Sequence, residues 1–397
     1  MVRKKILYIH HGKGLGGAPL SLLYLIKSLD QTRYEPIVLF LHHSEAMDLY
    51  KKEGITVVGP VGRYDFSHTK IYWFAWYHAH YVMRSIKDTF ITLLFSAPYW
   101  LRKIKPDIVH LNTSSLIAWG VAARRQGIKV VWHIREPLAP GYCGLRRAIV
   151  QKSVARYAHV IVPICKHDAQ PWASMNKTHV LHNPVDARVF DTTVSSDSVI
   201  KKYNIDLSQP TLLFLGGLSQ EKGTLQALRI FEQVLKIIPA AQLLLAGYCD
   251  LSCAGGMRKY FPMQKYKNEV SDLLYRLGDR VIRCGIVRNV PELMAASSVI
   301  LFPATVGHFA RPIIEAGFMK KPVLASALAP LDELVVDGKT GFLLDPHQPQ
   351  QWADRFAELM TDSVLYHTIA LQAYDFCWEH FEVGQYAKKM MDLYKEL

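Results

Sequence analysis

Short runs of β-branched and aliphatic residues recur along this chain, and each is followed by an amphipathic stretch long enough to form a helix. Apolar strands that alternate with helices are typical of parallel sheets covered on both faces. Strands are predicted in the first half at residues 6–9, 37–41, 55–58, 108–111, 130–134, 160–162 and 180–181. Strands are predicted in the second half at residues 212–215, 243–246, 281–282, 299–302, 323–325 and 342–344. The two series predict an α/β protein with two doubly wound, Rossmann-like domains.

The 397 residues are too many for one small core and suit two domains of roughly 150–200 residues each. The polar stretch 191–210, DTTVSSDSVIKKYNIDLSQP, is the predicted linker between a domain at 1–190 and a domain at 211–380. The remaining segment, 381–397, carries apolar residues at helical spacing, so we expect it to form a helix that packs on a domain surface. These residues are Tyr386, Met390 and Leu393.

Positive charge is concentrated in the first half of the chain. Residues 1–190 hold 26 of the 47 lysines and arginines but only 11 of the 34 acidic residues, a net charge of +15 against −2 for the rest. Such a surface is expected to face a membrane, a phosphorylated lipid or nucleic acid. Because no recognisable nucleic-acid-binding module accompanies the charge, we do not expect a nucleic-acid partner.

The segment 68–106 departs from the strand–helix rhythm, because it is dense in aromatic residues with basic residues between them. Trp73, Trp76, Tyr77, His80 and Tyr81 fall near one face of a helix. Two interpretations stay open. The aromatic residues pack into the core, or they meet a lipid interface, where Trp and Tyr lie at headgroup level beside Lys and Arg.

No apolar run reaches the roughly 18–20 residues of a membrane-spanning helix. The basic start MVRKKILYIHHGKG leads directly into a glycine turn, which predicts a first strand rather than a signal peptide. The six cysteines are scattered without zinc-site spacing, as is typical of free thiols in a reducing compartment. We therefore expect a cytoplasmic protein, peripheral on the inner membrane face, with no metal centre.

Ligands of open parallel sheets bind beyond the carboxyl ends of the strands, so the turns there are the candidate sites. In the first turn, Gly12, Gly14, Gly16 and Gly17 precede a predicted helix. Glycines allow a ligand to approach the backbone, and a helix N-terminus attracts anions. Gly12, Gly14 and Gly17 fit a dinucleotide fingerprint, but no acid ends the second strand, so a simple tight turn remains an alternative.

Three further turns carry polar residues. His133 ends a buried strand just before Arg135 and Glu136, where it could donate a hydrogen bond or transfer a proton, or serve only as a structural histidine. Lys222 follows a glycine turn in FLGGLSQEKG, where it suits a pyrophosphate, although a solvated surface lysine fits too.

The fourth turn lies in VGHFARPIIEAG, residues 306–317. Pro312 predicts a helix start, so the amides of Phe309, Ala310 and Arg311 should point at an anion. Glu315 lies one turn further and could accept hydrogen bonds from the two hydroxyls of a ribose. A carboxylate that merely complements the helix dipole is the alternative. Together these turns predict a nucleotide-activated donor bound between two facing domains.

In this order and spacing, the motifs resemble those of the family-4 retaining glycosyltransferases, which have the GT-B fold. The resemblance covers nearly the whole chain and is strongest over residues 211–346. It rests on GGAPLSLLYLIKSL, PDIVHLNTSS, HNPVD, FLGGLSQEKG, LLLAGYCD, VIRCGIVRNVPELMAASSVILFPA, HFARPIIEAGFMKKPVLAS and LVVDGKTGFLLDP.

The resemblance implies roles for the donor-side residues. Gly16 and Gly17 would border the donor phosphates and the acceptor. Lys222 would hold the diphosphate together with residues 309–311. Glu315 would bind the ribose, and the backbone near Val287 would receive the base.

The resemblance also implies roles on the sugar and acceptor side. His133 and Glu315 would be the catalytic residues, with His133 near the transferring sugar and His308 beside it, and Asn112 and Arg135 would lie on the acceptor side. The family uses neither metal nor cofactor, so the nucleotide-diphosphate sugar would be a substrate. Transfer with retention, cleft closure on the donor, and a C-terminal helix crossing back to the first domain are implied as well.

Two positions depart from the family pattern. Gly307 stands eight positions before Glu315, where the family has a second glutamate, and Gly217 stands where the family has an arginine. We hypothesise that Arg311 partly replaces the missing cation. Four functions stay open: a glycosyltransferase for a glycan or lipid-linked acceptor in envelope polysaccharide synthesis, which we favour, a sugar-nucleotide epimerase, a non-catalytic nucleotide-sugar binder, and a nucleic-acid binder.

Overall fold

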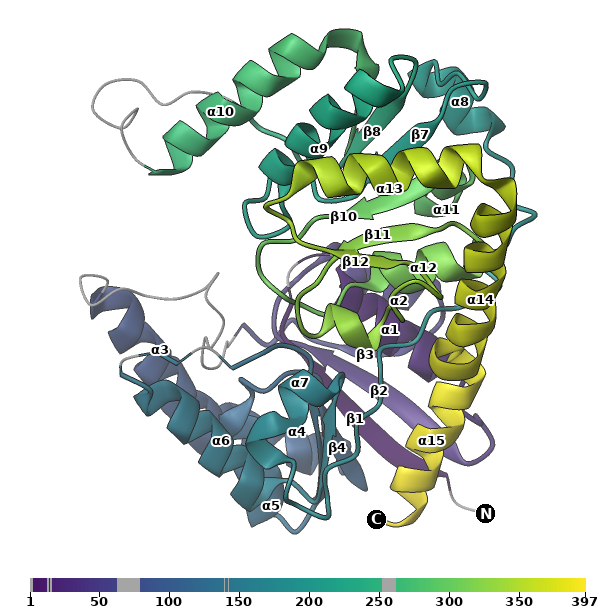
Figure 1. Ribbon diagram of the computed structural model, residues 1–397. Helices are drawn as coiled ribbons and strands as arrows, with labels where there is room; N and C mark the ends of the chain where they lie inside the picture. Colours follow the sequence, from purple (N-terminus) through teal and green to yellow (C-terminus); the bar gives the residue numbers. More distant parts are fainter. Residues whose placement is uncertain are drawn as a thin grey trace. The chain divides into compact units, whose positions relative to one another are not determined.

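The computed structural model describes residues 3–12, 14, 16–62, 79–138, 140–141, 143–251 and 262–397. Its contacts divide the chain into two compact units (Figure 1). The first unit comprises Met1–Pro184 and Val383–Leu397, and the second comprises Val185–Glu382. Each unit has its own parallel sheet with helices on both faces, which confirms the predicted fold of two Rossmann-like domains.

The described strands of the first unit form a six-stranded parallel sheet in the order β3-β2-β1-β4-β5-β6. They are β1 (Lys4–His10), β2 (Tyr34–Phe40), β3 (Thr56–Val58), β4 (Ile108–Leu111), β5 (Lys129–Ile134) and β6 (Val160–Pro163). The helices are α1 (Gly17–Lys27), α2 (Glu45–Lys52), α3 (Ala79–Ile91), α4 (Ala97–Ile104), α5 (Ile117–Arg125), α6 (Leu145–Tyr157), α7 (Lys166–Ala169) and α15 (Val383–Lys395).

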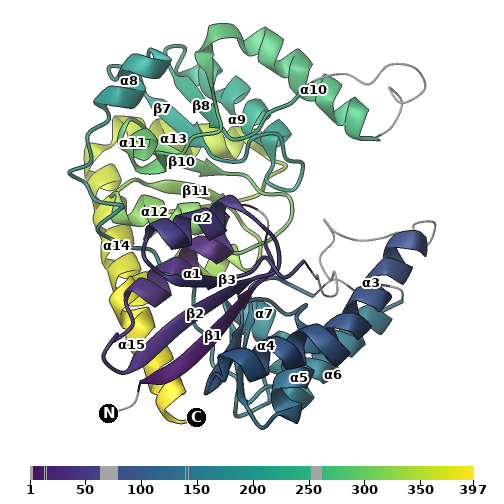
Figure 2. The same ribbon diagram turned by 180° about the vertical axis from the view of Figure 1, so that it is seen from behind.

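Alternation along the strands divides the first core into two layers, because successive side chains of a strand point to opposite faces. One face packs against α1, α2 and α15, and includes Tyr8, Val38, Ile108 and Val131. The opposite face packs against α4, α5 and α6, which Figure 2 shows gathered together. In α15, Tyr386, Met390 and Leu393 are buried against the first face, as their helical spacing predicts.

The second unit repeats this architecture with the strand order β12-β11-β10-β7-β8-β9. Its strands are β7 (Thr211–Phe214), β8 (Gln242–Ala246), β9 (Val281–Gly285), β10 (Val299–Phe302), β11 (Val323–Ser326) and β12 (Phe342–Leu344). Its helices are α8 (Asp197–Tyr203), α9 (Thr224–Ile237), α10 (Pro262–Leu277), α11 (Val290–Ala295), α12 (Arg311–Phe318), α13 (Pro349–Thr361) and α14 (Ser363–Phe381). Helices α9, α10 and α13 cover one face, and α11, α12 and α14 cover the other.

One predicted strand is wrong. Residues 180–181 run beside β6, where His179 N donates to Ile161 O and Leu181 N donates to Pro163 O. Only one bridge forms along this segment, between Ile161 and Thr178. The chain turns away at Asn183 and Pro184, and proline cannot donate the next ladder hydrogen bond, so no strand develops.

The aromatic segment 68–106 is described from residue 79 onward, and Trp73, Trp76 and Tyr77 lie outside the described residues. From Ala79 to Ile104 it is one continuous helix, in which α3 passes through a π-helical turn, η2 (Thr92–Ser96), into α4. Its buried side is anchored by Ala97 and Leu101 against the first sheet.

Candidate functional site

The strand order of the first sheet reverses between β1 and β4, because β2 and β3 extend it on one side and β5 and β6 on the other. Ligands of open parallel sheets bind at such a switch point, outside the carboxyl ends of the strands. Here β1 ends at His10, Asn112 directly follows β4, and Arg135 directly follows β5. The structure therefore brings the predicted residues Asn112 and Arg135 to one edge, together with a histidine that the sequence analysis did not select.

Asn112 connects the ends of these strands through hydrogen bonds. Its amide nitrogen donates to His10 Nδ1 at 3.1 Å, and its Oδ1 accepts from Arg135 Nε at 2.7 Å. Arg135 also donates to Asn183, and all four side chains are buried. Because an amide nitrogen only donates, His10 Nδ1 accepts, and the hydrogen of the neutral ring lies on Nε2.

His133, the predicted catalytic histidine, belongs to a second buried chain of hydrogen bonds. Tyr8 and Tyr394 join their hydroxyls at 3.1 Å, Tyr394 Oη lies 2.7 Å from His110 Nδ1, and His110 Nε2 lies 3.1 Å from His133 Nδ1. All four side chains are fully buried. Within the described residues, His133 Nε2 has no hydrogen-bond partner, so this nitrogen is the one available to a ligand.

Burial keeps these histidines uncharged. It lowers the pKa of His110 to about 3, and the Arg135 guanidinium acts in the same direction. Burial is also the main cause that lowers the pKa of His10 and His133 well below the usual range. At neutral pH each ring therefore has one N–H donor and one acceptor nitrogen.

The glycine-rich turn lies next to His10. A Cβ at Gly12 would lie 2.9 Å from His10 Nε2, so this N–H is directed at the turn, whereas a Cβ at Gly14 or Gly16 would meet no atom within 4 Å. Gly16 is the N-cap of α1 and Gly17 its first residue, without a side-chain cap or an acid in the first turn. An uncapped helix N-terminus with open backbone suits an anionic group.

The second sheet has its switch point between β7 and β10. The loops that follow these two strands contact each other, because Thr305 N donates to Glu221 O at 2.9 Å. Gly223 makes this approach possible, since its φ is +81° and a Cβ there would lie 1.8 Å from Pro303 O. Lys222 and residues 306–310 are therefore neighbours at this edge.

The two glycines that depart from the family pattern lie in these loops. Gly217 has φ +58°, and a Cβ there would lie 2.5 Å from Tyr248 O. A Cβ at Gly307 would lie 1.8 Å from Ala329 O. Neither position accepts a side chain on this backbone unless the neighbouring backbone shifts.

Lys222 and His308 lie together at this edge. His308 is half-buried, and its Nδ1 donates to Val306 O at 2.9 Å, which leaves Nε2 as the acceptor of the neutral ring. The pKa of His308 is lowered chiefly by burial and also by the charge of Lys222. Lys222 is exposed, although the protein atoms around it lower its pKa by desolvation.

Glu315 and Arg311 form a buried ion pair one turn apart in α12. The guanidinium nitrogen and the carboxylate oxygen are 2.9 Å apart, and the side chains are only 7% and 10% exposed. Burial raises the pKa of Glu315, and Arg311 opposes this effect. Arg311 thus neutralises Glu315 in this structure, and its role on donor phosphates stays a prediction.

The remaining predicted donor residues lie at different places along the sheet. Ala310 is the N-cap of α12, without a side-chain cap, and half-buried Phe309 precedes it and packs against the core. Val287 lies in the loop after β9, which is two strands away from β7. The roles predicted for these residues stay predictions.

Sequence reasoning missed His10, His110, Asn183 and Tyr394. A signal for the histidines was present, because strand periodicity places His10, His110 and His133 on the same sheet face as Tyr8. Nothing in the sequence indicated that Tyr394 would reach this face from the last helix.

The described residues offer neither a cluster of metal ligands nor a membrane-spanning helix. No group of three or more His, Cys, Asp or Glu side chains there could hold a metal ion. None of the helices described has the length and apolar character needed to cross a membrane.

Two family models match the chain, one to each half. The model described as Glycosyltransferase Family 4 matches residues 15–189, and the model described as Glycosyl transferases group 1 matches residues 195–376.

Among curated proteins, the chain is 23% identical to an alpha-maltose-1-phosphate synthase of Mycolicibacterium smegmatis, over 57% of this chain and 59% of that protein. It is 28% identical to a D-inositol 3-phosphate glycosyltransferase of Corynebacterium urealyticum, over 52% of this chain and 47% of that protein. The chain thus spans less than two thirds of the length of either relative.

Among solved structures, Anabaena HepE in complex with UDP and glucose covers 100% of both chains with a TM-score of 0.77 and 21% identity. A glycosyltransferase from Rickettsia africae has the same TM-score at 18% identity, over 99% of this chain and 98% of that chain. At these identities the likeness concerns the fold.

Proposed function

The chain belongs to glycosyltransferase family 4 and has the GT-B fold, and from this premise we propose that it transfers a sugar from a nucleoside-diphosphate donor to a glycan or lipid-linked acceptor. The observation that carries the proposal is the edge of the second sheet at β7 and β10. There Lys222 lies near the neutral His308, and α12 begins without a side-chain cap and holds Glu315 in a buried ion pair.

Each group at this edge matches one part of such a donor. The Lys222 ammonium and the N-terminus of α12 suit the diphosphate, since the ammonium is positively charged and a helix N-terminus carries partial positive charge. Glu315 suits the ribose, because a carboxylate oriented by Arg311 accepts hydrogen bonds from two adjacent hydroxyls. Structurally similar HepE has been solved with UDP and with UDP-glucose, which supports a nucleotide-sugar donor for this chain.

The proposed reaction proceeds without a metal and with retention at the anomeric carbon. Lys222 and the helix amides would stabilise the charge that develops on the departing diphosphate. His133, held uncharged by burial, would donate from its unpartnered nitrogen to an oxygen of the sugar. Asn112 and Arg135 belong to the neighbouring buried network, and we assign them to the acceptor side.

The glycine at position 307 should alter donor choice. Without a carboxylate there, the sugar end of the pocket is left to His308, whose Nε2 accepts hydrogen bonds but carries no charge. A non-catalytic nucleotide-sugar binder is the second candidate, because Gly307 and Gly217 both replace residues that the family uses.

One assay separates these functions. The purified protein is incubated with UDP-, GDP- and ADP-sugars, with and without octyl glycosides as lipid-like acceptors, and the products are separated by liquid chromatography and identified by mass spectrometry. Transfer predicts a glycosylated octyl glycoside and free nucleoside diphosphate, and the anomeric coupling in its proton NMR spectrum tests retention. Binding without turnover would identify a non-catalytic binder, and an isomerised donor without acceptor would identify an epimerase.

We further propose that the protein is cytoplasmic and acts at the membrane surface in cell-envelope polysaccharide synthesis. Met83, Ile86, Phe90 and Leu94 recur every three or four residues along the helix from Ala79 to Ile104, and each is 44–66% exposed. This spacing forms one apolar stripe on the solvent side, which we call the α3–α4 stripe, and Phe95 continues it at 68% exposure. Contiguous exposed apolar surface is typical of lipid or protein contacts.

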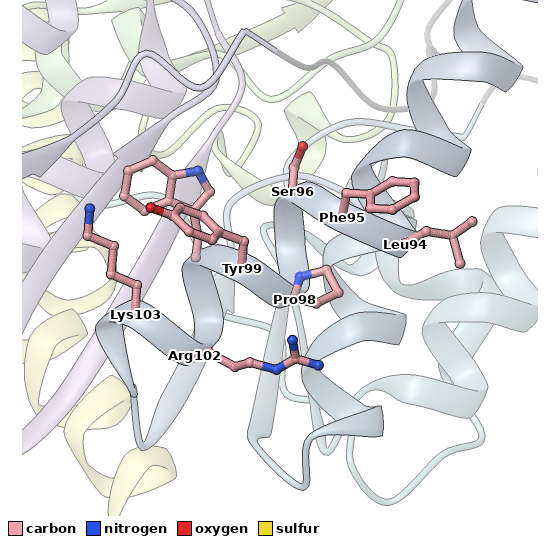
Figure 3. Close-up of a pocket in the computed structure, with 8 residues that line it drawn as sticks. Leu94, Phe95, Ser96, Pro98, Tyr99, Arg102 and Lys103 are labelled. Atoms are coloured by element: carbon pink, nitrogen blue, oxygen red, sulfur yellow. The ribbon is translucent and has the colours of Figure 1, made fainter.

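Basic and aromatic residues flank the α3–α4 stripe. Figure 3 shows Leu94, Phe95, Tyr99, Arg102 and Lys103 around a recess of about 720 Å³. The Lys103 ammonium lies 4.9 Å from the ring centre of Trp100. Aromatic rings beside cations match the headgroup level of an anionic bilayer, so we assign this surface to anionic lipid.

Vesicle flotation tests this assignment. Binding should be stronger to vesicles that contain phosphatidylglycerol than to phosphatidylcholine alone, and Leu94→Ser with Phe95→Ser should weaken it about tenfold or more, because each buried apolar side chain contributes about 1.5–3 kcal/mol. Leu371→Ser is the control, since Leu371 is an exposed apolar residue of α14 in the other unit. Equal binding to both vesicle types, or an unchanged double variant, would refute the assignment.

A further inference from the structure

The buried chain Tyr8–Tyr394–His110–His133 links the last helix of the protein to the candidate catalytic histidine. Tyr394 lies in α15, 284 positions after His110, and both residues belong to the first unit. The rings are also in contact, with centres 5.1 Å apart for Tyr8 and His110 and 5.3 Å apart for His110 and His133. No charged residue takes part in the three hydrogen bonds of this chain.

The hydrogen bonds that join these four side chains have a direction, from donor to acceptor. Each hydrogen bond uses one hydrogen, each hydroxyl supplies one, and each neutral imidazole supplies one. The two bonds of His110 must therefore run in the same direction, because its neutral ring has one donor and one acceptor nitrogen. Either all three bonds run from Tyr8 to His133, or the two histidine bonds run toward Tyr394, whose hydroxyl then donates to Tyr8 or accepts from it.

The two directions leave different atoms without a partner. If the histidine bonds run toward Tyr394, the hydroxyl hydrogen of either Tyr8 or Tyr394 has no acceptor among the described residues. The acceptor nitrogen of His133 is then unsatisfied as well. If the bonds run toward His133, every hydrogen is used except the one on His133 Nε2. The direction toward Tyr394 thus leaves two buried polar groups unsatisfied and the direction toward His133 leaves one, so the direction toward His133 is the favoured one.

We propose that Tyr394 is a positioning residue for the reaction, which acts through His110 to fix the tautomer of His133 with its hydrogen on Nε2. This inference rests on the proposed function for its consequence: His133 then presents a hydrogen-bond donor, rather than an acceptor, to an oxygen of the donor sugar. The C-terminal helix thereby supplies part of the active site of the first unit.

The tautomer is measured directly by nitrogen-15 NMR of the full-length protein with labelled histidine, because protonated and unprotonated ring nitrogens have well-separated shifts. The spectrum of His133→Gln assigns the His133 signals. The wild-type protein should show His133 with hydrogen on Nε2 and bare Nδ1. A spectrum with hydrogen on Nδ1 would overturn the proposal without any further variant.

Two variants separate positioning from packing. Tyr394→Phe and Tyr8→Phe each remove one buried hydroxyl from the same touching pair. In Tyr8→Phe, His110 is the one acceptor left for the hydroxyl hydrogen of Tyr394 among the described residues, so Tyr394 should still donate to it and the His133 tautomer should be retained. In Tyr394→Phe, nothing fixes the direction of the remaining bond, so the signals should shift toward a mixture. If the two variants gave the same spectrum, the tyrosines would contribute packing and would not fix the tautomer of His133.

Kinetics provide the functional readout. Tyr394→Phe should lower kcat about threefold to tenfold with the donor KM unchanged, because it weakens an interaction in the transition state, and Tyr8→Phe should stay within twofold of wild type. A tenfold loss in both variants would contradict the assignment. The tautomer experiment needs no activity, so a failure of the proposed transferase function is distinguished from a failure of this inference.

Discussion

The carboxyl edges of the two sheets have the same topology but differ in chemistry. The first combines buried neutral histidines with the cation Arg135, and the second carries a lysine and a buried ion pair. In the first unit, His10, His110 and His133 are buried and uncharged, and their hydrogen bonds fix which nitrogens donate. In the second unit, the corresponding edge carries the ammonium of Lys222 and the ion pair of Arg311 with Glu315.

This difference indicates separate roles for the two edges. Charges attract and hold an anionic donor, whereas neutral groups with fixed donors and acceptors recognise hydroxyls without attracting counter-ions. It also predicts that different changes destabilise the two units. The second unit should lose stability when its buried ion pair is broken, and the first when its buried histidines are protonated.

The largest effect should come from breaking the charge pair of the second unit. Glu315→Gln removes the anionic half of a buried ion pair, so the free energy of unfolding should fall by about 3–5 kcal/mol. Hydrogen exchange followed by mass spectrometry would report this loss in the peptides of the second unit.

The control for this variant is Glu358→Gln in α13, which breaks an ion pair with Arg355 on the exposed surface of the same unit. That pair should contribute about 0.5 kcal/mol or less. If Glu315→Gln cost no more than Glu358→Gln, the charges of the second unit would not be the stabilising feature that the comparison assumes.

Acid should destabilise the first unit more than the second. The pKa of His110 is about 3 in the folded state against about 6.5 unfolded, so the unfolded state binds more protons between these values and stability falls as pH decreases through 6.5. At pH 5 this amounts to about 2 kcal/mol from His110 alone. The lowered pKa values of His10 and His133 act in the same direction.

The second unit should respond differently, because the pKa of Glu315 is raised, and protonation of such a group favours the folded state as pH falls. Hydrogen exchange at pH 7.5 and pH 5, corrected for intrinsic rates, compares the two units in one experiment. Equal loss of protection in both units would contradict the assignment of neutral histidines to the first.

A smaller effect is expected at the glycine of the donor loop. Gly307→Ala places a methyl group on Ala329 O, so the loop must shift, at a cost of about 1–3 kcal/mol. Gly16→Ala in the first unit is the matched variant, because its methyl group meets no atom within 4 Å and stability should be unchanged. Thermal unfolding of both variants tests the contrast, and equal melting temperatures would show that Gly307 is not sterically required.

Much of this architecture could be predicted from the sequence, because apolar strands and amphipathic helices are local patterns. Twelve of the thirteen predicted strands are present among the described residues, and His133, Lys222 and Glu315 could be selected from strand ends and turns. The hydrogen-bond and ion-pair partners of the site residues could not be predicted. Tyr394 reaches His110 from a distant helix, and Arg311 pairs with Glu315 through a rotamer choice that spacing permits but does not require.

The steric reason for the two glycines could not be predicted from the sequence either. A sequence shows that Gly307 and Gly217 lack a side chain, but only the positions of Ala329 and Tyr248 show that none fits.

The central claim is that the charged edge of the second unit binds a nucleoside-diphosphate sugar, and isothermal titration with UDP-, GDP- and ADP-sugars tests it most directly. At least one of these donors should bind the wild-type protein. Lys222→Ala should weaken that binding about tenfold to a hundredfold, because a hydrogen bond to a charged group contributes about 1.5–3 kcal/mol. Lys236→Ala, which removes an exposed lysine of α9, should leave the affinity unchanged. Absence of binding by every donor, or equal affinity of Lys222→Ala and wild type, would contradict the account.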